Sequence, residues 1–277
     1  MKRIEGNFKG VRNANIYYQA WLPDGDVKAV LFLVHGLGEH SGRYMNHVDR
    51  FVPLGYAVYG LDHVGHGKSG GQREVIDRFS DYTGTLRIYY EMVKGWRPGK
   101  PIFVLAHSMG ALIACDYILD HPADFKGAIL SAPPIVVGDD FSPFILTMAR
   151  VLSVIAPKAG VSKLDTAAIS HDPEVVKAYE NDPLVFHEKT PARLGGEMLK
   201  TIARINAEIG KITLPFITVQ GSKDLLANPG GSQMLYDKAG SKDKTLKIYE
   251  GLFHEVHNEP EREVMFKDVE SWLGAHV

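Results

Sequence analysis

The feature that most constrains this chain is a series of short apolar runs that recurs through most of its 277 residues. The runs are 29–34, 57–61, 102–106, 128–130, 216–219 and 246–249. Several are nearly continuous rather than alternating, which is typical of strands buried on both faces of a parallel sheet. Helical segments separate them, as at 78–96, 111–121 and 259–273. Strand followed by helix, repeated, predicts right-handed crossovers and a three-layer α/β sandwich.

The length suits one large α/β domain spanning 1–277, preceded at its edge by an antiparallel hairpin that includes Ile16 to Tyr18. The net charge is −2 and the sequence has no basic run, so it does not indicate a nucleic-acid-binding surface. The first seven residues carry charge but no apolar stretch, so we expect no signal peptide. The lone Cys115 fits a reducing, cytoplasmic location, although a disulfide-free secreted protein would have the same cysteine content.

One long segment interrupts the strand–helix rhythm. About 85 residues separate the run near 130 from the run near 216, far more than a crossover needs. Residues 141–155 within it are strongly apolar at helical spacing. The apolar positions are Phe141, Phe144, Ile145, Met148, Val151, Leu152 and Ile155. This stretch fits either a core helix or part of a cap over approximately 134–210 whose outer surface contacts lipid. Its position favours the cap, because insertions gather above the carboxyl ends of strands.

The segment 102–112 predicts a nucleophile. An apolar run leads directly into Ser108 and then into an apolar helical stretch, as in the strand–turn–helix elbow of the G-x-S-x-G motif. The positions two before and two after must be small, and they are Ala106 and Gly110. Ala106 departs from the usual glycine by one methyl group. The alternative is a serine that only caps a helix.

A serine hydroxyl needs a base, and the base needs an orienting acid. Asp224 follows the run 216–219 and His254 follows the run 246–249, in the chain order serine, acid, histidine. Each alone would be an ordinary loop residue, but all three follow strands that end at the same edge of the sheet. Because His254 must be neutral to accept a proton, we expect activity to fall as pH drops through roughly 6 to 7.

The developing oxyanion needs two converging N–H donors. One prediction is the backbone N–H of Met109, directly after Ser108. The other is that of Leu37, in the glycine-containing loop that follows the run 29–34.

Two other motifs carry less weight. Residues 65–70 satisfy G-x-G-x-x-G, but Gln72 to Glu74 follow instead of an apolar helix start, so we interpret this stretch as a loop. His254 and His257 lie one residue short of the H-E-x-x-H spacing and follow a strand rather than lying in a helix. We therefore expect neither a metal nor a cofactor.

With these residues identified, the chain resembles the monoacylglycerol lipase family of serine α/β-hydrolases, which has monoglyceride and lysophospholipase types. The likeness runs nearly end to end. Its most specific segments are HGLGEHSGRY (35–44), DHVGHGKS (62–69), HSMG (107–110), QGSKD (220–224) and YEGLFHEVH (249–257). The family pattern has glycine where this chain has Ala106 and Ala111, which bears on the fine geometry of the elbow and not on the identity of the nucleophile.

The resemblance implies an α/β-hydrolase fold with a mostly parallel central sheet, flanking helices and an inserted helical cap. It implies the triad Ser108, Asp224 and His254 with oxyanion donors Leu37 and Met109. It further implies a polar pocket for the glycerol head group. The residues of that pocket are Glu39, Arg43 and His257.

The resulting prediction is an esterase that hydrolyses monoacylglycerol to glycerol and fatty acid through an acyl-enzyme. Its partner is a small lipid ester, with peripheral membrane contact through the apolar cap. Alternatives are a lysophospholipase, a broad carboxylesterase or an acyltransferase, which share the acyl-enzyme. A further alternative is a small-lipid binding module on the same fold, which would have no need of all three triad residues.

Overall fold

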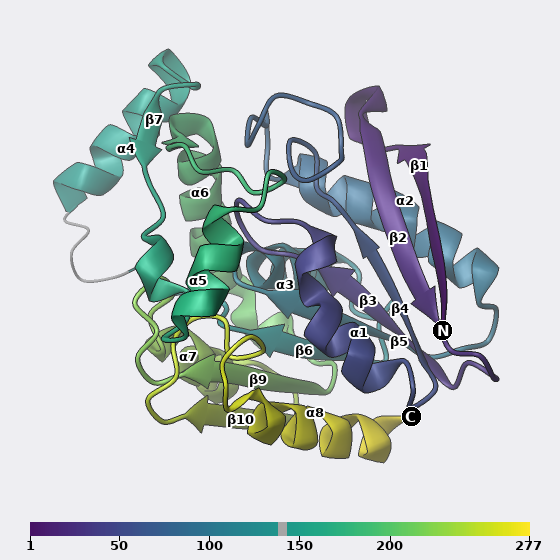
Figure 1. The fold of residues 1–277 in the computed structure, drawn as a ribbon. Coiled ribbons are helices and arrows are strands. Elements are labelled where there is room, and N and C mark those ends of the chain that lie inside the picture. The colour runs from purple at the N-terminus through teal and green to yellow at the C-terminus, as the bar shows by residue number, and fades with distance from the viewer. Residues whose placement is uncertain (138–142) are drawn as a thin grey trace.

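The computed structural model describes residues 1–137 and 143–277, and it is built on an eight-stranded sheet (Figure 1). The strands, in their order across the sheet, are β1 (Lys2–Lys9), β2 (Asn15–Leu22), β4 (Tyr56–Leu61), β3 (Ala29–Val34), β5 (Ile102–His107), β6 (Gly127–Ser131), β9 (Phe216–Gly221) and β10 (Lys244–Tyr249). From β4 to β10 every neighbouring pair is parallel, while β2 is antiparallel to both β1 and β4. The mostly parallel sheet with an edge hairpin is therefore confirmed.

Both faces of the sheet are buried, which explains the continuous apolar runs. Along β3, Val30 and Phe32 enter one hydrophobic cluster, whereas Leu31 and Leu33 enter the other. Helices α2 (Ser80–Trp96), α3 (Met109–Asp120) and α7 (Gly230–Lys238) contribute to the first cluster. Helices α1 (Met45–Phe51) and α8 (Arg262–His276) contribute to the second. Successive side chains of a strand point to opposite faces, so a strand covered on both sides must be apolar at every position.

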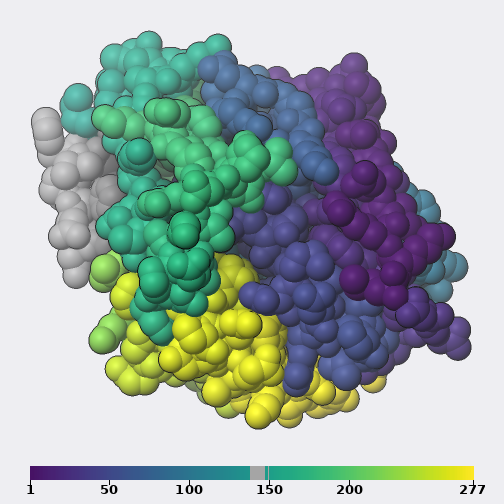
Figure 2. All heavy atoms as spheres, viewed as in Figure 1, coloured from purple at the N-terminus to yellow at the C-terminus, as the bar shows by residue number. Residues whose placement is uncertain are grey.

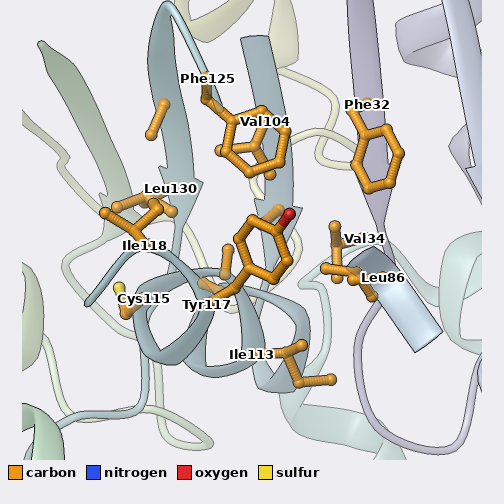
Figure 3. Packing of buried hydrophobic residues seen from close by; sticks show 14 of the residues in the cluster. Phe32, Val34, Leu86, Val104, Ile113, Cys115, Tyr117, Ile118, Phe125 and Leu130 are labelled. Carbon is orange, nitrogen blue, oxygen red and sulfur yellow. The ribbon is translucent and has the colours of Figure 1, made fainter. Parts of the chain in front are cut away.

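Helix α3 follows Ser108 and is buried along its whole length except at Asp120. Figure 3 shows Tyr117 of this helix close to Phe125, and Ile118 close to Leu130. These two rings lie 5.5 Å apart, and Phe125 in turn lies 5.7 Å from Phe32. The packed helix gives the residue at its N-terminus a rigid support. Burial raises the pKa of the Cys115 thiol on this helix to about 12, as expected for an inert core thiol.

The described residues between β6 and β9 form an inserted segment with seven elements. Its elements are α4 (Pro143–Ile155), β7 (Gly160–Ser162), the 3₁₀ turn η3 (Thr166–Ala168), α5 (Pro173–Glu180), β8 (Thr190–Pro191), α6 (Ala192–Glu208) and η4 (Ile209–Lys211). Helix α6 packs on α3, and α4 packs on α6 at the outside of the molecule (Figure 1). The space-filling view shows this teal-to-green segment beside the yellow C-terminal region (Figure 2).

Helix α4 contributes none of its described side chains to the hydrophobic clusters of the core. Its exposed apolar residues include Val154 and Ile155, whose exposed fractions are 66% and 72%. Phe141 and the side chains of Phe144 and Ile145 lie outside the described residues. Within the described ranges, no helix has both the length and the apolarity needed to cross a bilayer.

Two short 3₁₀ turns lie outside the inserted segment, η1 (Val11–Asn13) in the hairpin and η2 (Ser41–Tyr44) before α1. Residues 65–70 form turns, and α2 begins only at Ser80, so the loop interpretation of the glycine-rich stretch is confirmed.

Candidate active site

Ser108 occupies the sharp turn between β5 and α3. Its backbone φ of 53° and ψ of −125° lie in a region that residues other than glycine rarely adopt. The turn persists because both flanks are tightly packed. A Cβ atom on Gly110 would lie 2.1 Å from the Val34 carbonyl oxygen, so only glycine fits there. Ala106 is fully buried in β5, where the structure accommodates its extra methyl group.

The loops after β9 and β10 bring Asp224 and His254 to this turn. His254 Nε2 lies 2.9 Å from Ser108 Oγ, and His254 Nδ1 lies 2.8 Å from Asp224 Oδ2. The two loops touch at Gly221, where a Cβ atom would lie 2.2 Å from the Leu252 carbonyl oxygen. Three side chains far apart in sequence thus form one hydrogen-bonded chain at the carboxyl edge of the sheet.

The acid is held in its ionised form. Asp224 Oδ1 accepts hydrogen bonds from the backbone N–H groups of Leu226 and Ala227, both at 2.9 Å. Burial would raise the pKa of Asp224, but the His254 ring and these hydrogen bonds lower it, and the pKa ends below its ordinary value. Burial lowers the pKa of His254, but the charge of Asp224 raises it more, and the pKa ends above its ordinary value. An ionised acid next to a histidine of raised pKa is the arrangement a general base requires.

The loop after β3 lies against the nucleophile. A Cβ atom on Gly36 would lie 3.2 Å from the Ser108 Cβ atom, so the next residue, Leu37, is held beside the serine. Met109 opens α3, and the first N–H groups of a helix have no intrahelical acceptor. The backbone N–H groups of Leu37 and Met109 therefore come from the two segments that flank Ser108. This arrangement can stabilise negative charge on a carbonyl oxygen bound there.

Comparison with known proteins gives the same class of enzyme. The family model described as "Hydrolase_4: Serine aminopeptidase, S33" matches residues 25–261. The monoacylglycerol lipase of Mycolicibacterium smegmatis is 39% identical over 275 residues, which cover 99% of this chain and 98% of that protein. The chain belongs to this family of serine α/β-hydrolases. It is a carboxylic ester hydrolase.

Other relatives of this hydrolase extend the likeness. The monoglyceride lipase of Homo sapiens is 34% identical over 262 residues, which cover 94% of this chain and 86% of that protein. The crystal structure of the Paleococcus ferrophilus monoacylglycerol lipase superposes with a TM-score of 0.83 at 29% identity, with 100% of both chains covered. The match spans the sheet and the inserted segment alike.

Two residues that the resemblance assigned to a head-group pocket form a buried ion pair in this hydrolase. Glu39 Oε2 accepts a hydrogen bond of 2.8 Å from Arg43 Nη1. The other oxygen of Glu39 accepts hydrogen bonds from the Gly36 N–H at 2.6 Å and the Tyr44 hydroxyl at 2.7 Å. Arg43 also contacts Glu255, directly after His254. These partners belong to the loops that carry His254 and Leu37.

His257, the third predicted head-group residue, lies among aromatic rings. Its ring stacks on Tyr44 at 5.1 Å between centroids and lies 4.9 Å from the ring of His107. Neither ring nitrogen of His257 has a hydrogen-bond partner among the described residues. Burial lowers its pKa well below the ordinary value, so the ring is neutral. Its role toward a head group stays a prediction.

The inserted segment contacts both loops that meet at Ser108. The Phe186 N–H donates to the Gly38 carbonyl oxygen at 2.8 Å, one residue after Leu37. His40 Nε2 lies 2.9 Å from Asp182 Oδ2. On the other side, the Glu255 N–H donates to the Ile169 carbonyl oxygen at 2.8 Å. The segment is thus attached directly beside the predicted oxyanion donor and beside the predicted base.

Two acidic residues that the sequence patterns do not single out, Glu255 and Glu259, bond to the histidine loop or its neighbours. Glu259, fully buried, accepts hydrogen bonds from the Phe253 N–H at 2.8 Å and from Ser170 Oγ at 2.7 Å. Glu255 contacts Arg43 through both of its carboxylate oxygens. No local pattern distinguishes these two residues from the other acidic residues of the loop, because their burial depends on partners elsewhere in the chain.

Proposed function

We propose that this hydrolase cleaves monoacylglycerol to glycerol and a free fatty acid, with Ser108 as nucleophile, His254 as general base and Asp224 as orienting acid. The observation that carries the proposal is the continuous Ser108–His254–Asp224 chain, at 2.9 and 2.8 Å, with the serine at a strained turn. The substrate class is supported by the relatives named monoacylglycerol or monoglyceride lipase, two of which match nearly the whole chain.

In the first half-reaction Ser108 Oγ attacks the ester carbonyl carbon, and its proton passes to His254 Nε2. The N–H groups of Leu37 and Met109 stabilise the tetrahedral oxyanion, each contributing about 10²–10³ in rate. As this intermediate collapses, the C–O bond to glycerol breaks and the imidazolium donates its proton to the departing glycerol oxygen. Asp224 holds the ring in the tautomer that these transfers require.

In the second half-reaction water attacks the carbonyl carbon of the acyl-enzyme. His254 accepts the proton of this water and returns a proton to Ser108 Oγ as the fatty acid leaves. Burial of each methylene group of the acyl chain contributes about 0.8 kcal/mol, so kcat/KM rises with chain length until the acyl site is full.

The inserted segment, approximately 134–210, forms the cap in this proposal. Two observations support it: the segment is attached at Gly38 and at Glu255, and the apolar side chains at the end of α4 face outward. A peripheral membrane contact through α4 would place the cap against the source of lipid esters.

Fatty-acid release from a panel of esters tests the proposal. The panel holds a monoacylglycerol, a diacylglycerol, a triacylglycerol, lysophosphatidylcholine and a short aryl ester, with Ser108→Ala as the control. We expect the highest turnover with the monoacylglycerol. If turnover is highest with the lysophospholipid or the aryl ester, the triad assignment stands, but monoacylglycerol is not the preferred substrate. Release by the Ser108→Ala variant would contradict the nucleophile.

A further inference from the structure

A buried guanidinium joins two carboxylates next to the base. Arg43 Nη1 lies 2.8 Å from Glu39 Oε2 and 2.6 Å from Glu255 Oε1, and Arg43 Nη2 lies 2.8 Å from Glu255 Oε2. The exposed fractions of the three side chains are only 9%, 3% and 4%. Charge-assisted bonds of this length, away from water, are the strong and geometrically specific ones.

These bonds connect the two loops on which the chemistry depends. At one end, Glu39 Oε1 accepts the Gly36 N–H at 2.6 Å, and Gly36 precedes the predicted oxyanion donor Leu37. At the other end, Glu255 directly follows His254. The path from Leu37 to His254 therefore runs through one carboxylate, one guanidinium and a second carboxylate. A displacement of Arg43 would shift both loops at once.

Two carboxylates of this group face one guanidinium, and they differ: burial and the charge of Glu255 raise the pKa of Glu39 despite the opposing charge of Arg43. Burial raises the pKa of Glu255, but the charge and hydrogen bonds of Arg43 outweigh it and hold the pKa well below the ordinary value. Glu255 is thus ionised throughout the working pH range. Its charge, together with those of Asp224 and Glu39, raises the pKa of His254 against the opposing effect of burial.

The other ionisable groups around His254 are neutral histidines. The His107 ring lies 4.6 Å from that of His254, and His257 lies beyond it. Burial lowers the pKa values of both His107 and His257 well below the ordinary value. In the pH range where His254 titrates, the charges near it are therefore those of Asp224 and of the Glu39–Arg43–Glu255 group.

We propose that Glu255 is a positioning residue that acts through Arg43. It fixes the oxyanion loop relative to the base, and it places a second buried negative charge beside the imidazolium that forms during each proton transfer. This inference rests on the proposed function of the triad. It differs from a head-group role for Arg43, because positioning acts on every ester and a head-group contact acts only on esters of glycerol.

The test is Glu255→Gln, which retains the shape and removes the charge. We expect kcat/KM to fall about 10- to 100-fold, mostly through kcat, for both a monoacylglycerol and a short aryl ester. The acid limb of the pH profile of kcat/KM should also move to lower pH, by roughly half a unit. The sign follows because loss of a nearby negative charge lowers the pKa of His254, so the base stays neutral to lower pH.

Two companion variants sharpen the test. Arg43→Lys retains the charge but loses the bidentate geometry, so it should lower kcat for both esters with little shift of the acid limb. Glu270→Gln is the matched control, because it removes a carboxylate from another arginine pair, with Arg50, between α1 and α8. It should change neither kcat nor the pH profile.

A loss confined to the glycerol ester would overturn the proposal in favour of a head-group contact. An unchanged kcat with an unmoved acid limb in folded Glu255→Gln would overturn it outright. If that variant does not fold, Glu255→Asp decides: kcat should fall for both esters with the acid limb in place, and an unchanged kcat would contradict positioning. Failure of the proposed function is separable, because Ser108→Ala would then retain turnover of the aryl ester.

Discussion

The sheet edge and the inserted segment are built on different principles. At the sheet edge, Ser108, Asp224 and His254 are joined by hydrogen bonds of 2.8 and 2.9 Å on loops that follow strands of the central sheet. In the inserted segment, α4 carries exposed apolar side chains and packs on α6 rather than on the sheet. The difference teaches that the proposed chemistry depends on loops anchored to the core, whereas the proposed lipid contact lies on a helix whose described side chains do not join the core.

Besides the packing of α6 on α3, polar contacts join the inserted segment to the loops at the sheet edge. Asp182 reaches His40 and Phe186 reaches Gly38 on one side, while Ile169 reaches Glu255 on the other. If the comparison is right, variants at the sheet edge should affect every ester. Variants in the inserted segment should affect lipid esters alone.

The largest expected effect belongs to Ser108→Ala. Removal of the nucleophile should lower kcat at least about 10⁴-fold for a monoacylglycerol and a short aryl ester alike, because both pass through the same acyl-enzyme. Fatty-acid and chromophore release measure the two losses, and thermal unfolding checks that the variant is folded. A loss with only one of the two esters would contradict the expectation that variants at the sheet edge affect every ester.

The next largest effect concerns pH. Because the pKa of His254 is raised above its ordinary value of about 6.5, the fall of kcat/KM toward acid should have its midpoint above that value. The sign follows because the base must be neutral: a raised pKa protonates it at higher pH, so activity is full above the midpoint and falls about tenfold per unit below it. Initial rates with the aryl ester from pH 5 to 9 measure this. A flat profile down to pH 5 in folded enzyme would exclude His254 as base.

A smaller effect is expected at the attachment of the inserted segment. Asp182→Asn removes the charge that faces His40 and weakens one of the contacts between the regions. We expect kcat/KM for a long-chain monoacylglycerol to fall about 3- to 10-fold, with the short aryl ester nearly unaffected, since a partly buried pair contributes roughly 1 kcal/mol. Asp165→Asn, which caps η3 within the same segment, is the control. Equal losses on both esters would mean that this contact supports the triad itself.

The smallest expected effect lies at the outer end of α4. Ile155→Asp should reduce flotation with liposomes several-fold, because an exposed apolar side chain is replaced by a charge. Val264→Asp on α8 is the matched control, because Val264 is also an exposed apolar residue but lies on a helix that packs against the sheet. Neither variant should change turnover of the aryl ester. An equal loss of flotation in both variants would contradict the proposal that α4 is the membrane contact.

The sheet was predictable because burial on two faces requires a continuous apolar run, as at 29–34. The serine candidate was predictable because the tight turn at Ser108 requires small residues on either side. Gly110 shows the second constraint directly, since no other residue fits against Val34. The edge strand β10 was predicted two residues short, because its first residues are only half buried and carry a weaker apolar signal.

The roles of Glu255 and the three-residue strand β7 were not predictable. Glu255 acquires its partner Arg43 from 212 residues earlier in the chain, and no local pattern encodes such a meeting. All three residues of strand β7 are exposed, so no apolar periodicity reveals the strand. Sequence patterns report burial and local sterics, whereas pairings between distant polar residues follow only from the assembled fold.

The most direct test of the central claim is to trap the acyl-enzyme. Rapid acid quench of a reaction with a slowly deacylating ester, followed by peptide mass mapping, shows which residue carries the acyl group. We predict an acyl mass on the peptide that contains Ser108, and none in Ser108→Ala. An acyl group on another residue, or turnover of monoacylglycerol without any acyl-enzyme, would contradict the account.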